Sequence, residues 1–428
     1  MTDGKLTLRK VIQITMASNV LEWYEYIIFA FLYSAIGKHF FSTSVPMVAA
    51  LETFSVFALS YLARPFGSLF FGWLADNHSV SKSARIAMFM MAIPPITIIF
   101  IPSFSQIGIL APILLVSIRL VQGFAAGGEL PASATFAYNH SESKYKRLAC
   151  ALVNCSSLIG VLLSSVTITV MHATLTSEQI IAGAWKYPFY FSIPLFLFLF
   201  WMRKDLLLMD KEEKPKSAKT ASYWQTILQH KASFLTGFMV IASLQISFYL
   251  MFIWIPSYLS LFLKVPKLTA SAFNTMSLSI MVVTVIATGI ALIRFDGKKL
   301  LLKLMGVQVV VVPALFYLLI HNQSYFTLIS VSVIFAILVG IIDAIALSFL
   351  GDLFKSDIRG IGMNLTFTLP AVFFGGFSPL IATWLIHQTG WLMMPAIMID
   401  VVLLLSIPAV IKFGRELNNH QASPLPSA

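Results

Sequence analysis

Long apolar runs separated by short polar connections occupy almost the whole chain. Each run holds roughly 20 residues, which is the length that an α-helix needs to cross a bilayer. Backbone groups in hydrocarbon need internal partners, and uninterrupted apolar runs obtain them as helices rather than as strands of a barrel. The pattern predicts helices over residues 13–37, 48–72, 84–102, 111–138, 147–171, 187–203, 234–260, 272–293, 300–320, 325–350, 360–387 and 391–411.

One long polar connection separates the first six of these helices from the last six. It contains the charged run 210–216, followed by serine-rich sequence, and has the composition of a solvated linker. The predicted fold class is an all-α polytopic membrane protein. We expect an N-terminal six-helix bundle over residues 1–203, a linker over 204–233, a C-terminal bundle over 234–412 and a short tail over 413–428.

Composition agrees with this class. Hydrophobic residues make up 58% of the chain and charged residues 11%, which excludes a soluble protein with a single buried core. The first apolar run contains Asn19, Glu22 and Glu25 and continues directly into a full span. A cleaved signal peptide has a purely apolar centre, so we do not expect removal of the N-terminus.

Basic residues are distributed unevenly between the two sets of alternating loops. Of the 29 Lys and Arg residues, 23 fall at the termini, in the linker and in the loops on the same side. The loops of the other side hold only Lys38, Lys186, Lys264 and Lys267. The positive-inside rule therefore predicts that both termini and the linker face the cytoplasm. The net charge of +11 follows from this topology and from contact with membrane lipid, so we do not expect nucleic acid as a partner.

No sequence pattern points to an enzyme, a metal site or a cofactor. The chain lacks the phosphate-binding pattern G-x-x-x-x-G-K-[ST] and the zinc pattern H-E-x-x-H. Its two cysteines, Cys150 and Cys155, have no Cys or His partner at metal-ligand spacing, so they are interpreted as packing residues. We therefore expect no enzymatic activity, and an ion gradient as the energy source.

The first predicted helix carries a polar face. Asn19, Glu22 and Tyr26 follow i, i+3, i+7 spacing and share one side of the helix, with Trp23 and Glu25 flanking them. Charged groups are costly in lipid, so this face is expected to line a cavity. A carboxylate in a partly dehydrated cavity can take up a proton from one side of the membrane and release it to the other. The alternative is a permanent ion-pair lock between helices.

Four segments carry motifs. Residues 18–26 read SNVLEWYEY, and residues 119–129 read RLVQGFAAGGE. Residues 61–76 include Gly72 and Asp76 of a loop pattern G-x-L-x-D-R-x-G-R-K/R, whose later cations are missing. Residues 352–385 contain DLF, then Arg359 and FGGFSPLIATWL. Together these resemble the metabolite:proton symporter branch of the major facilitator superfamily, which includes proline/betaine, 2-oxoglutarate, shikimate and citrate transporters.

The resemblance covers about residues 10 to 410. It implies the major-facilitator fold, with twelve transmembrane helices in two pseudo-symmetric halves that rock about a central site. It also implies a monomeric, multi-pass protein of the bacterial inner membrane. The second copy of the loop motif, after helix 272–293, is poorly matched, with Ile293 where an Asp would be expected and Arg294 remaining.

The candidate residues fall into two groups. The proton-coupling and substrate cavity is predicted to contain Asn19, Glu22, Trp23, Glu25, Tyr26, Arg119, Gln122, Glu129 and Asp343. Gln122 and Glu129 are predicted on nearly the same helix face, seven residues apart. The cytoplasmic gate is predicted to contain Arg64, Gly72, Asp76, Arg294 and Arg359, with an ion pair between Arg64 and Asp76.

The substrate is less defined by the sequence. Trp23 and Tyr26 beside carboxylates suit a quaternary ammonium group, whereas Arg119 suits a carboxylate. A zwitterion such as proline or glycine betaine satisfies both, and a dicarboxylate such as 2-oxoglutarate is the alternative. Proton and sodium coupling both remain open. A non-transporting transceptor is the alternative of another class, and a channel is disfavoured. Residues after Arg415 lack heptads, so we do not expect the coiled-coil tail of osmosensing relatives.

Overall fold

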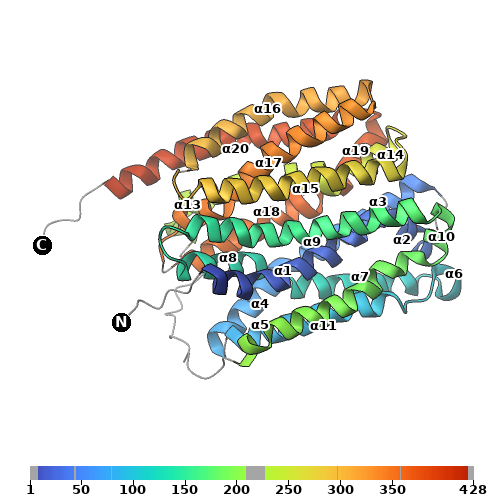
Figure 1. The fold of residues 1–428 in the computed structure, drawn as a ribbon, viewed down its shortest axis with the longest axis horizontal. Helices are drawn as coiled ribbons and strands as arrows, with labels where there is room; N and C mark the ends of the chain where they lie inside the picture. Colours follow the sequence, from blue (N-terminus) through green and yellow to red (C-terminus); the bar gives the residue numbers. More distant parts are fainter. Residues whose placement is uncertain are drawn as a thin grey trace, which may run out of the picture.

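The computed structural model describes residues 8–42, 45–78, 80–208, 227–295, 297–356 and 358–422. Within these ranges the regular structure is entirely helical. The long helices run roughly along a common axis, and the described residues begin and end at the same end of the bundle (Figure 1). The apolar runs of the sequence therefore fold as helices, as predicted.

The N-terminal half is built from long helices, several of them in two pieces. They are α1 (Leu8–Phe31) with α2 (Tyr33–Phe40), α3 (Pro46–Leu62) with α4 (Arg64–Asn77), α5 (Val80–Ile98), α7 (Leu110–Ala125) with α8 (Glu129–His140), α9 (Lys146–Thr174) and α11 (Tyr187–Leu208). Three short elements lie in the connections: α6 (Phe104–Ile107), α10 (Ser177–Ala182) and the 3₁₀ turn η1 (Ala184–Lys186).

The C-terminal half repeats this plan. It contains α13 (Lys231–Phe248), the π-helix η2 (Tyr249–Ile253) and α14 (Ile255–Leu261), then α15 (Lys267–Ala291), α16 (Lys298–His321) and α17 (Tyr325–Leu353), then α18 (Arg359–Pro370), the π-helix η3 (Ala371–Gly376) and α19 (Ser378–Thr389), and finally α20 (Met394–Ala422). The predicted linker, residues 204–233, falls mostly outside the described residues.

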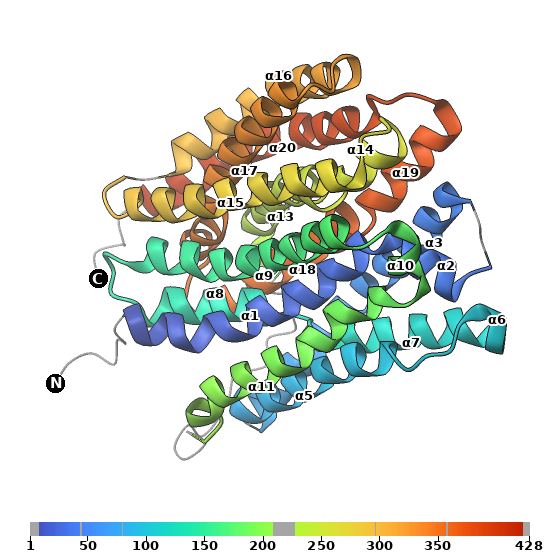
Figure 2. The ribbon, with the colours of Figure 1, turned by 45° about the vertical axis from the view of Figure 1, so that its right-hand side comes forward.

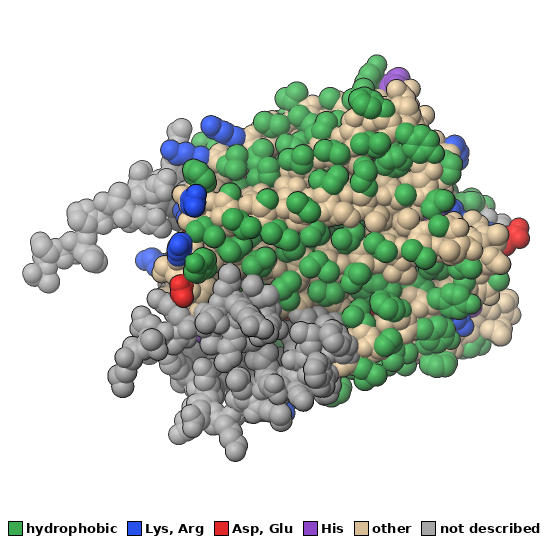
Figure 3. Space-filling model, in the orientation of Figure 1, with side chains coloured by type: hydrophobic (Ala, Val, Ile, Leu, Met, Phe, Trp, Pro, Cys, Tyr) green, Lys and Arg blue, Asp and Glu red, His purple; other side chains and the backbone are tan. Residues whose placement is uncertain are grey.

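The surface matches a protein embedded in lipid. Among the described residues, nine helices or helix pairs are long and apolar enough to cross a membrane. Hydrophobic side chains cover the middle of the molecule, and Lys and Arg gather toward its ends (Figure 3). A bilayer therefore fits around the middle, with the charged ends in water.

Five of the predicted helices are interrupted, which hydropathy alone does not indicate. The break at Ala63 precedes Pro65, whose ring favours the first turn of a new helix. The predicted helix 111–138 is two helices, because Gly128 adopts a φ of 85° and turns the chain between α7 and α8. Helix 360–387 changes to a π-helix directly after Pro370, which cannot donate a backbone hydrogen bond.

Helix α9 packs closely against α1, the helix with the polar face. A Cβ on Gly160 would overlap the Val20 carbonyl oxygen, so only glycine allows this approach. One helical turn further along α9, Ser164 Oγ donates to the Tyr24 carbonyl oxygen at 2.7 Å. The small residues spaced four apart on α9 therefore form the contact surface for α1.

The two halves meet side by side along α9 and α15, and both views show these helices next to each other (Figures 1 and 2). Hydroxyl groups join them: Thr275 Oγ1 lies 2.8 Å from both Ser165 Oγ and Thr169 Oγ1. Ser and Thr hydroxyls can also donate to backbone carbonyl oxygens of their own helix. The two helices can therefore separate without leaving these hydroxyl groups unpaired.

Candidate functional site

Arg64 places a buried positive charge beside α1. It is the first residue of α4, and its side chain is 6% exposed. Its Nη2 lies 3.4 Å from Glu22 Oε1. The guanidinium carbon lies 4.3 Å from the ring centroid of Tyr26 and 4.2 Å from that of Tyr61. An ion pair and two cation–π contacts therefore hold this side chain in the interior.

This position differs from the predicted gate pair of Arg64 with Asp76. The sequence predicts one continuous helix over 48–72, which would put Arg64 near its cytoplasmic end. The helical segment continues to Asn77, so Arg64 lies well inside the span, and its side chain reaches α1 and contacts Glu22. The side chain of Asp76 lies outside the described residues.

Arg119 brings a second guanidinium to the same aromatic ring. It is 2% exposed on α7, and its Cζ lies 4.6 Å from the Tyr26 centroid and 4.2 Å from that of Phe29. It donates a hydrogen bond to Gln122 Oε1, one helical turn later. Tyr26 is fixed in turn, because its hydroxyl donates to Ser60 Oγ at 2.7 Å.

Two carboxylates complete this central cluster, which consists of Glu22, Glu25, Tyr26, Arg64 and Arg119. Glu22 and Glu25 are each 1% exposed. The charged neighbours of Glu25 are Arg119 and Glu22. Neither of its carboxylate oxygens has a hydrogen-bond donor in place among the described residues, although Ser192 lies alongside. The cluster thus contains two positive and two negative groups, of which one carboxylate is not engaged by an ion pair.

Glu129 lies less deep than predicted. It is half-buried at the first position of α8, within electrostatic reach of Glu22. The predicted face shared with Gln122 assumed a continuous helix, and the turn at Ala126–Gly128 interrupts it. Gln122 therefore pairs with Arg119 within α7, whereas Glu129 belongs to the next helix.

Trp23 borders both the central cluster and a second polar cavity. Its ring lies 5.7 Å from Arg64 Cζ. It also lines a cavity of about 20 Å³, together with Asp343, Asn154 and Gln245. This volume is enough for about one water molecule. The remaining predicted residue of α1, Asn19, donates from Nδ2 to Ser156 Oγ of α9 at 3.2 Å.

Asp343 enters this cavity from α17. It is 6% exposed, and its Oδ2 has no hydrogen-bond partner among the described residues. Asn154 of α9 donates to the Asp343 backbone carbonyl oxygen at 3.1 Å, so the cavity lies where the two halves meet. A polar group of a ligand could therefore contact both halves here.

A tyrosine pair missed by the sequence analysis joins the halves near the central cluster. The hydroxyls of Tyr61 and Tyr249 are hydrogen-bonded, and both side chains are fully buried. Tyr249 is the first residue of the π-helix η2, and such interruptions are frequent at functional sites. No local pattern marks this pair, because its members are 188 residues apart in the chain.

Contacts between the halves also close the end of the bundle near the chain termini. Arg359 Nη1 donates to Asn139 Oδ1 at 2.5 Å, and its guanidinium carbon lies 4.6 Å from the Tyr138 centroid. Asp352 accepts a hydrogen bond from Tyr138 Oη and lies 3.4 Å from Arg147 Nη2. We call these five residues the terminal clasp.

The other residues predicted for the gate do not take part in the terminal clasp. Arg294 is exposed and has no ion pair among the residues described. Gly72 is half-buried, and a Cβ there would meet open space. Arg359 is thus the predicted gate residue that the structure places in the terminal clasp between the halves. Its partners Tyr138 and Asn139 were not predicted from the sequence.

The sequence profile of the Major Facilitator Superfamily matches residues 16–372. The chain belongs to this superfamily. It is therefore a transporter with two six-helix halves, and a multi-pass membrane protein. The fold class expected from the sequence, and its resemblance to this superfamily, are confirmed.

Among curated superfamily members, the chain is similar to two named proline/betaine transporters. One, from Salmonella typhimurium (strain LT2), is 26% identical over 442 residues, covering 100% of this chain and 87% of the relative. The other, from Escherichia coli (strain K12), is 27% identical over 442 residues with the same coverage. Among solved structures, the proton:xylose symporter XylE bound to 6-bromo-6-deoxy-D-glucose superposes with a TM-score of 0.73 at 12% identity, covering 95% of each chain.

Transporters of this superfamily expose a central site alternately to the two sides of the membrane. In this structure the end near the chain termini is joined by the terminal clasp. At the opposite end, a cavity of about 580 Å³ lies between α2, α10, α14 and α15. The described residues therefore show a state that is closed at one end and hollow at the other.

Proposed function

We propose that this transporter is a proton-coupled symporter of a small zwitterionic or carboxylate metabolite, of the proline/betaine type. The names of its relatives support the substrate class, and the buried charges on α1 support coupling to an ion. By the positive-inside rule, we further propose that both termini and the linker face the cytoplasm of a bacterial cell.

The observation that carries the proposal is the unequal pairing of the two glutamates. Glu22 faces the guanidinium of Arg64, whereas neither carboxylate oxygen of Glu25 meets hydrogen-bond geometry within the described part of the chain. Ser192 and Arg119 are its polar neighbours, and Arg119 also contacts the rings of Tyr26 and Phe29. A buried carboxylate without a matched counter-ion is a site where a proton can bind and leave. We assign proton coupling to Glu25, with Glu22 and Arg64 as its charge-balancing neighbours.

The surroundings of this cluster suit a zwitterion. The rings of Trp23, Tyr26 and Tyr61 already hold guanidinium groups, and aromatic faces of this kind bind quaternary ammonium groups too. Arg119 offers a planar donor for a carboxylate. Asp343, across Trp23, offers a negative group from the other half. A ligand with both charges could therefore connect the halves.

Uptake into proteoliposomes tests this proposal. Purified protein is reconstituted, an inward proton gradient is imposed, and accumulation of labelled proline, glycine betaine and 2-oxoglutarate is measured for the parent, Glu22→Gln, Glu25→Gln and Glu129→Gln. The matched control is Glu178→Gln, an exposed acidic residue of α10. An inward sodium gradient without a proton gradient forms a separate arm.

We expect proton-driven accumulation of proline or glycine betaine in the parent and in Glu178→Gln. Glu25→Gln should lose uphill uptake but retain exchange of substrate across the membrane, because exchange needs no net proton movement. Accumulation driven only by sodium contradicts proton coupling. Accumulation of 2-oxoglutarate alone replaces the zwitterion by the dicarboxylate alternative.

A further inference from the structure

The hollow end of the bundle contains a polar vestibule between the halves. Its outer part is the cavity of about 580 Å³, and a narrower inner pocket of about 50 Å³ continues from it. The two parts share lining residues, among them Ser34, His172 and Lys267. Three of the elements that line it, α2, α10 and α14, lie at the end of the bundle away from the chain termini (Figure 1).

The vestibule gathers positive charge from both halves. Lys38 follows α1 in the N-terminal half, and Lys264 and Lys267 belong to the C-terminal half, yet all three line the same cavity. Among the described residues, no Asp or Glu lines either part. Glu178 is the acidic residue adjacent in sequence to the lining residue Ser177, and it is exposed.

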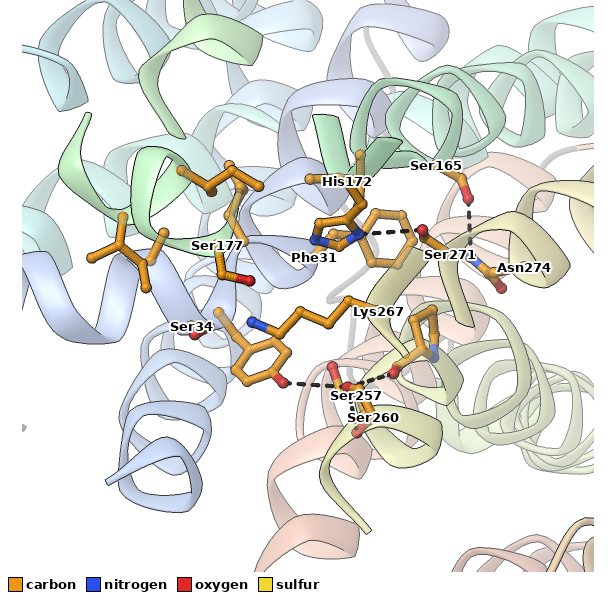
Figure 4. Close-up of a pocket in the computed structure, with 17 residues that line it drawn as sticks. Phe31, Ser34, Ser165, His172, Ser177, Ser257, Ser260, Lys267, Ser271 and Asn274 are labelled. Carbon is orange, nitrogen blue, oxygen red and sulfur yellow. Dashed lines mark hydrogen bonds between the residues drawn. The ribbon is translucent and has the colours of Figure 1, made fainter. Parts of the chain in front are cut away.

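Lys267 directs its charge into this space. Figure 4 shows its ammonium group extending between Ser34 and Ser177. Lys267 is also the first residue of α15, a helix of 25 residues, so its charge lies beside a helix N-terminus whose free N–H groups attract anions. Two independent sources of positive potential therefore act at one place.

Hydroxyl groups line the same vestibule as these lysines. Tyr33 Oη and Ser260 Oγ approach to 3.4 Å across the vestibule, and His172 Nδ1 lies 3.2 Å from Ser271 Oγ (Figure 4). Ser34 and Ser177 add hydroxyls on the N-terminal side. A carboxylate binds through charged and neutral N–H and O–H donors together, which is the set present here.

We propose that this vestibule is an outer recruitment site for carboxylate groups, which selects solutes that carry a carboxylate and disfavours purely cationic ones. The central cluster, with two carboxylates and two guanidiniums, has no such preference by charge alone. Selection by charge therefore takes place before the solute reaches it. This proposal depends on the proposed transport function in one respect: it assumes that the recruited carboxylate belongs to the transported solute.

The local potential can be measured without transport. In the Ser177→Cys variant, the rate of modification by the anionic reagent 2-sulfonatoethyl methanethiosulfonate is compared with that of the cationic 2-(trimethylammonium)ethyl reagent. Each rate is divided by that of free cysteine. The native cysteines, Cys150 and Cys155, are buried, and the parent protein serves as the blank. A cleft lined by one sign of charge raises the local concentration of the opposite ion by about tenfold or more.

We expect the anionic reagent to react about tenfold faster than the cationic one at low salt, with the difference shrinking as salt screens the charges. Lys38→Gln and Lys267→Gln should each lower the ratio several-fold. Lys186→Gln is the matched control. Lys186 belongs to the same set of loops as Lys38, Lys264 and Lys267, but it does not line the vestibule. Equal rates for both reagents, or an equal effect of Lys186→Gln, would overturn the proposal.

A protection arm identifies the chemistry of the ligand. The same labelling is repeated with glycine betaine, 2-oxoglutarate or choline present. Slower labelling by the carboxylates but not by choline supports carboxylate recruitment, and equal protection by choline contradicts it. Because labelling needs neither a gradient nor turnover, failure of this arm is distinguishable from failure of the symport proposal.

Discussion

Glu22 Oε1 and Arg64 Nη2 lie 3.4 Å apart in the interior of the N-terminal half. The pair joins α1 to α4, and Arg64 extends the connection by stacking on Tyr61. Tyr61 is hydrogen-bonded to Tyr249 of the C-terminal half. A charged group on the first helix is thus connected through three side-chain contacts to the opposite half, which gives it a physical route to influence how the halves meet.

A double-mutant cycle on Glu22 and Arg64 should show strong coupling. Glu22→Gln or Arg64→Gln alone leaves one buried charge without its partner, which costs about 3–5 kcal/mol. The double variant removes both charges and should recover most of that loss. The measurement is thermal unfolding in detergent of the two single variants, the double variant and the parent.

Arg294→Gln is the control, since Arg294 is exposed and should leave the unfolding temperature unchanged. If the double variant is destabilised by the sum of the single effects, the pair contributes no coupling free energy. In that case the 3.4 Å contact would not be an energetic connection between α1 and α4.

The helices, the two halves and the polar face of α1 could be predicted because they depend on local periodicity. The neighbour of Arg64 could not, because it depends on how α4 packs against α1, and hydropathy does not record the packing of one helix against another. The bond between Tyr61 and Tyr249 was also beyond prediction, because it depends on how the halves dock.

The vestibule is a second feature that the sequence alone could not predict. The sequence identifies Lys38, Lys264 and Lys267 as three of the four lysines in the loops opposite the basic ones, but only as a contrast that sets topology. Their separation in the chain is large, and their shared cavity follows from the approach of α2 to α14 and α15. Charge counting therefore predicts a side of the membrane, whereas the cavity that the three lysines share is visible only in the fold.

Asp352→Asn should open the end that the terminal clasp closes. The carboxylate accepts from Tyr138 and faces Arg147, and hydrogen bonds that involve a charged group contribute about 1.5–3 kcal/mol. Loss of this charged hydrogen bond should raise the ratio of molecules with an open terminal end to molecules with a closed one by about tenfold or more. Spin labels at Lys144→Cys and Lys355→Cys, both exposed and on opposite halves, report the separation by pulsed electron resonance.

The control for this change is Asp400→Asn, a half-buried acidic residue on α20 away from the clasp. It should leave the distance distribution unchanged. A distribution in Asp352→Asn that matches the parent would show that the clasp does not determine which end is closed.

Two glycines of α4 should respond in opposite ways to alanine. A Cβ on Gly67 would overlap the backbone carbonyl of Phe124 on α7, whereas a Cβ on Gly72 meets nothing nearby. Gly67→Ala should therefore destabilise the protein by about 1–3 kcal/mol through overpacking. Gly72→Ala should be neutral or stabilising by up to about 1 kcal/mol, since alanine favours helix.

Thermal unfolding of the two variants in the same detergent gives the comparison directly. Equal destabilisation by both substitutions would contradict the close approach of α4 to α7. It would also place Gly72 under a packing constraint that the structure does not show.

Asp343→Asn should separate a binding role from a structural one. Asp343 Oδ2 has no hydrogen-bond partner in the described residues, so an amide of the same shape removes no side-chain contact of that atom. The unfolding temperature should therefore stay the same or rise, because an uncompensated buried charge is removed. If the carboxylate instead meets the positive group of a zwitterion, glycine betaine binding should weaken about tenfold or more.

Asn154→Ala provides the matched comparison in the same cavity. Asn154 donates to the Asp343 backbone carbonyl oxygen across the two halves, so its removal should lower stability by about 1 kcal/mol. Isothermal titration calorimetry measures betaine binding to the purified variants, and thermal unfolding of the same samples measures their stability. Unchanged binding in Asp343→Asn together with lowered stability would make Asp343 a structural residue and leave the ammonium group to the aromatic rings of α1.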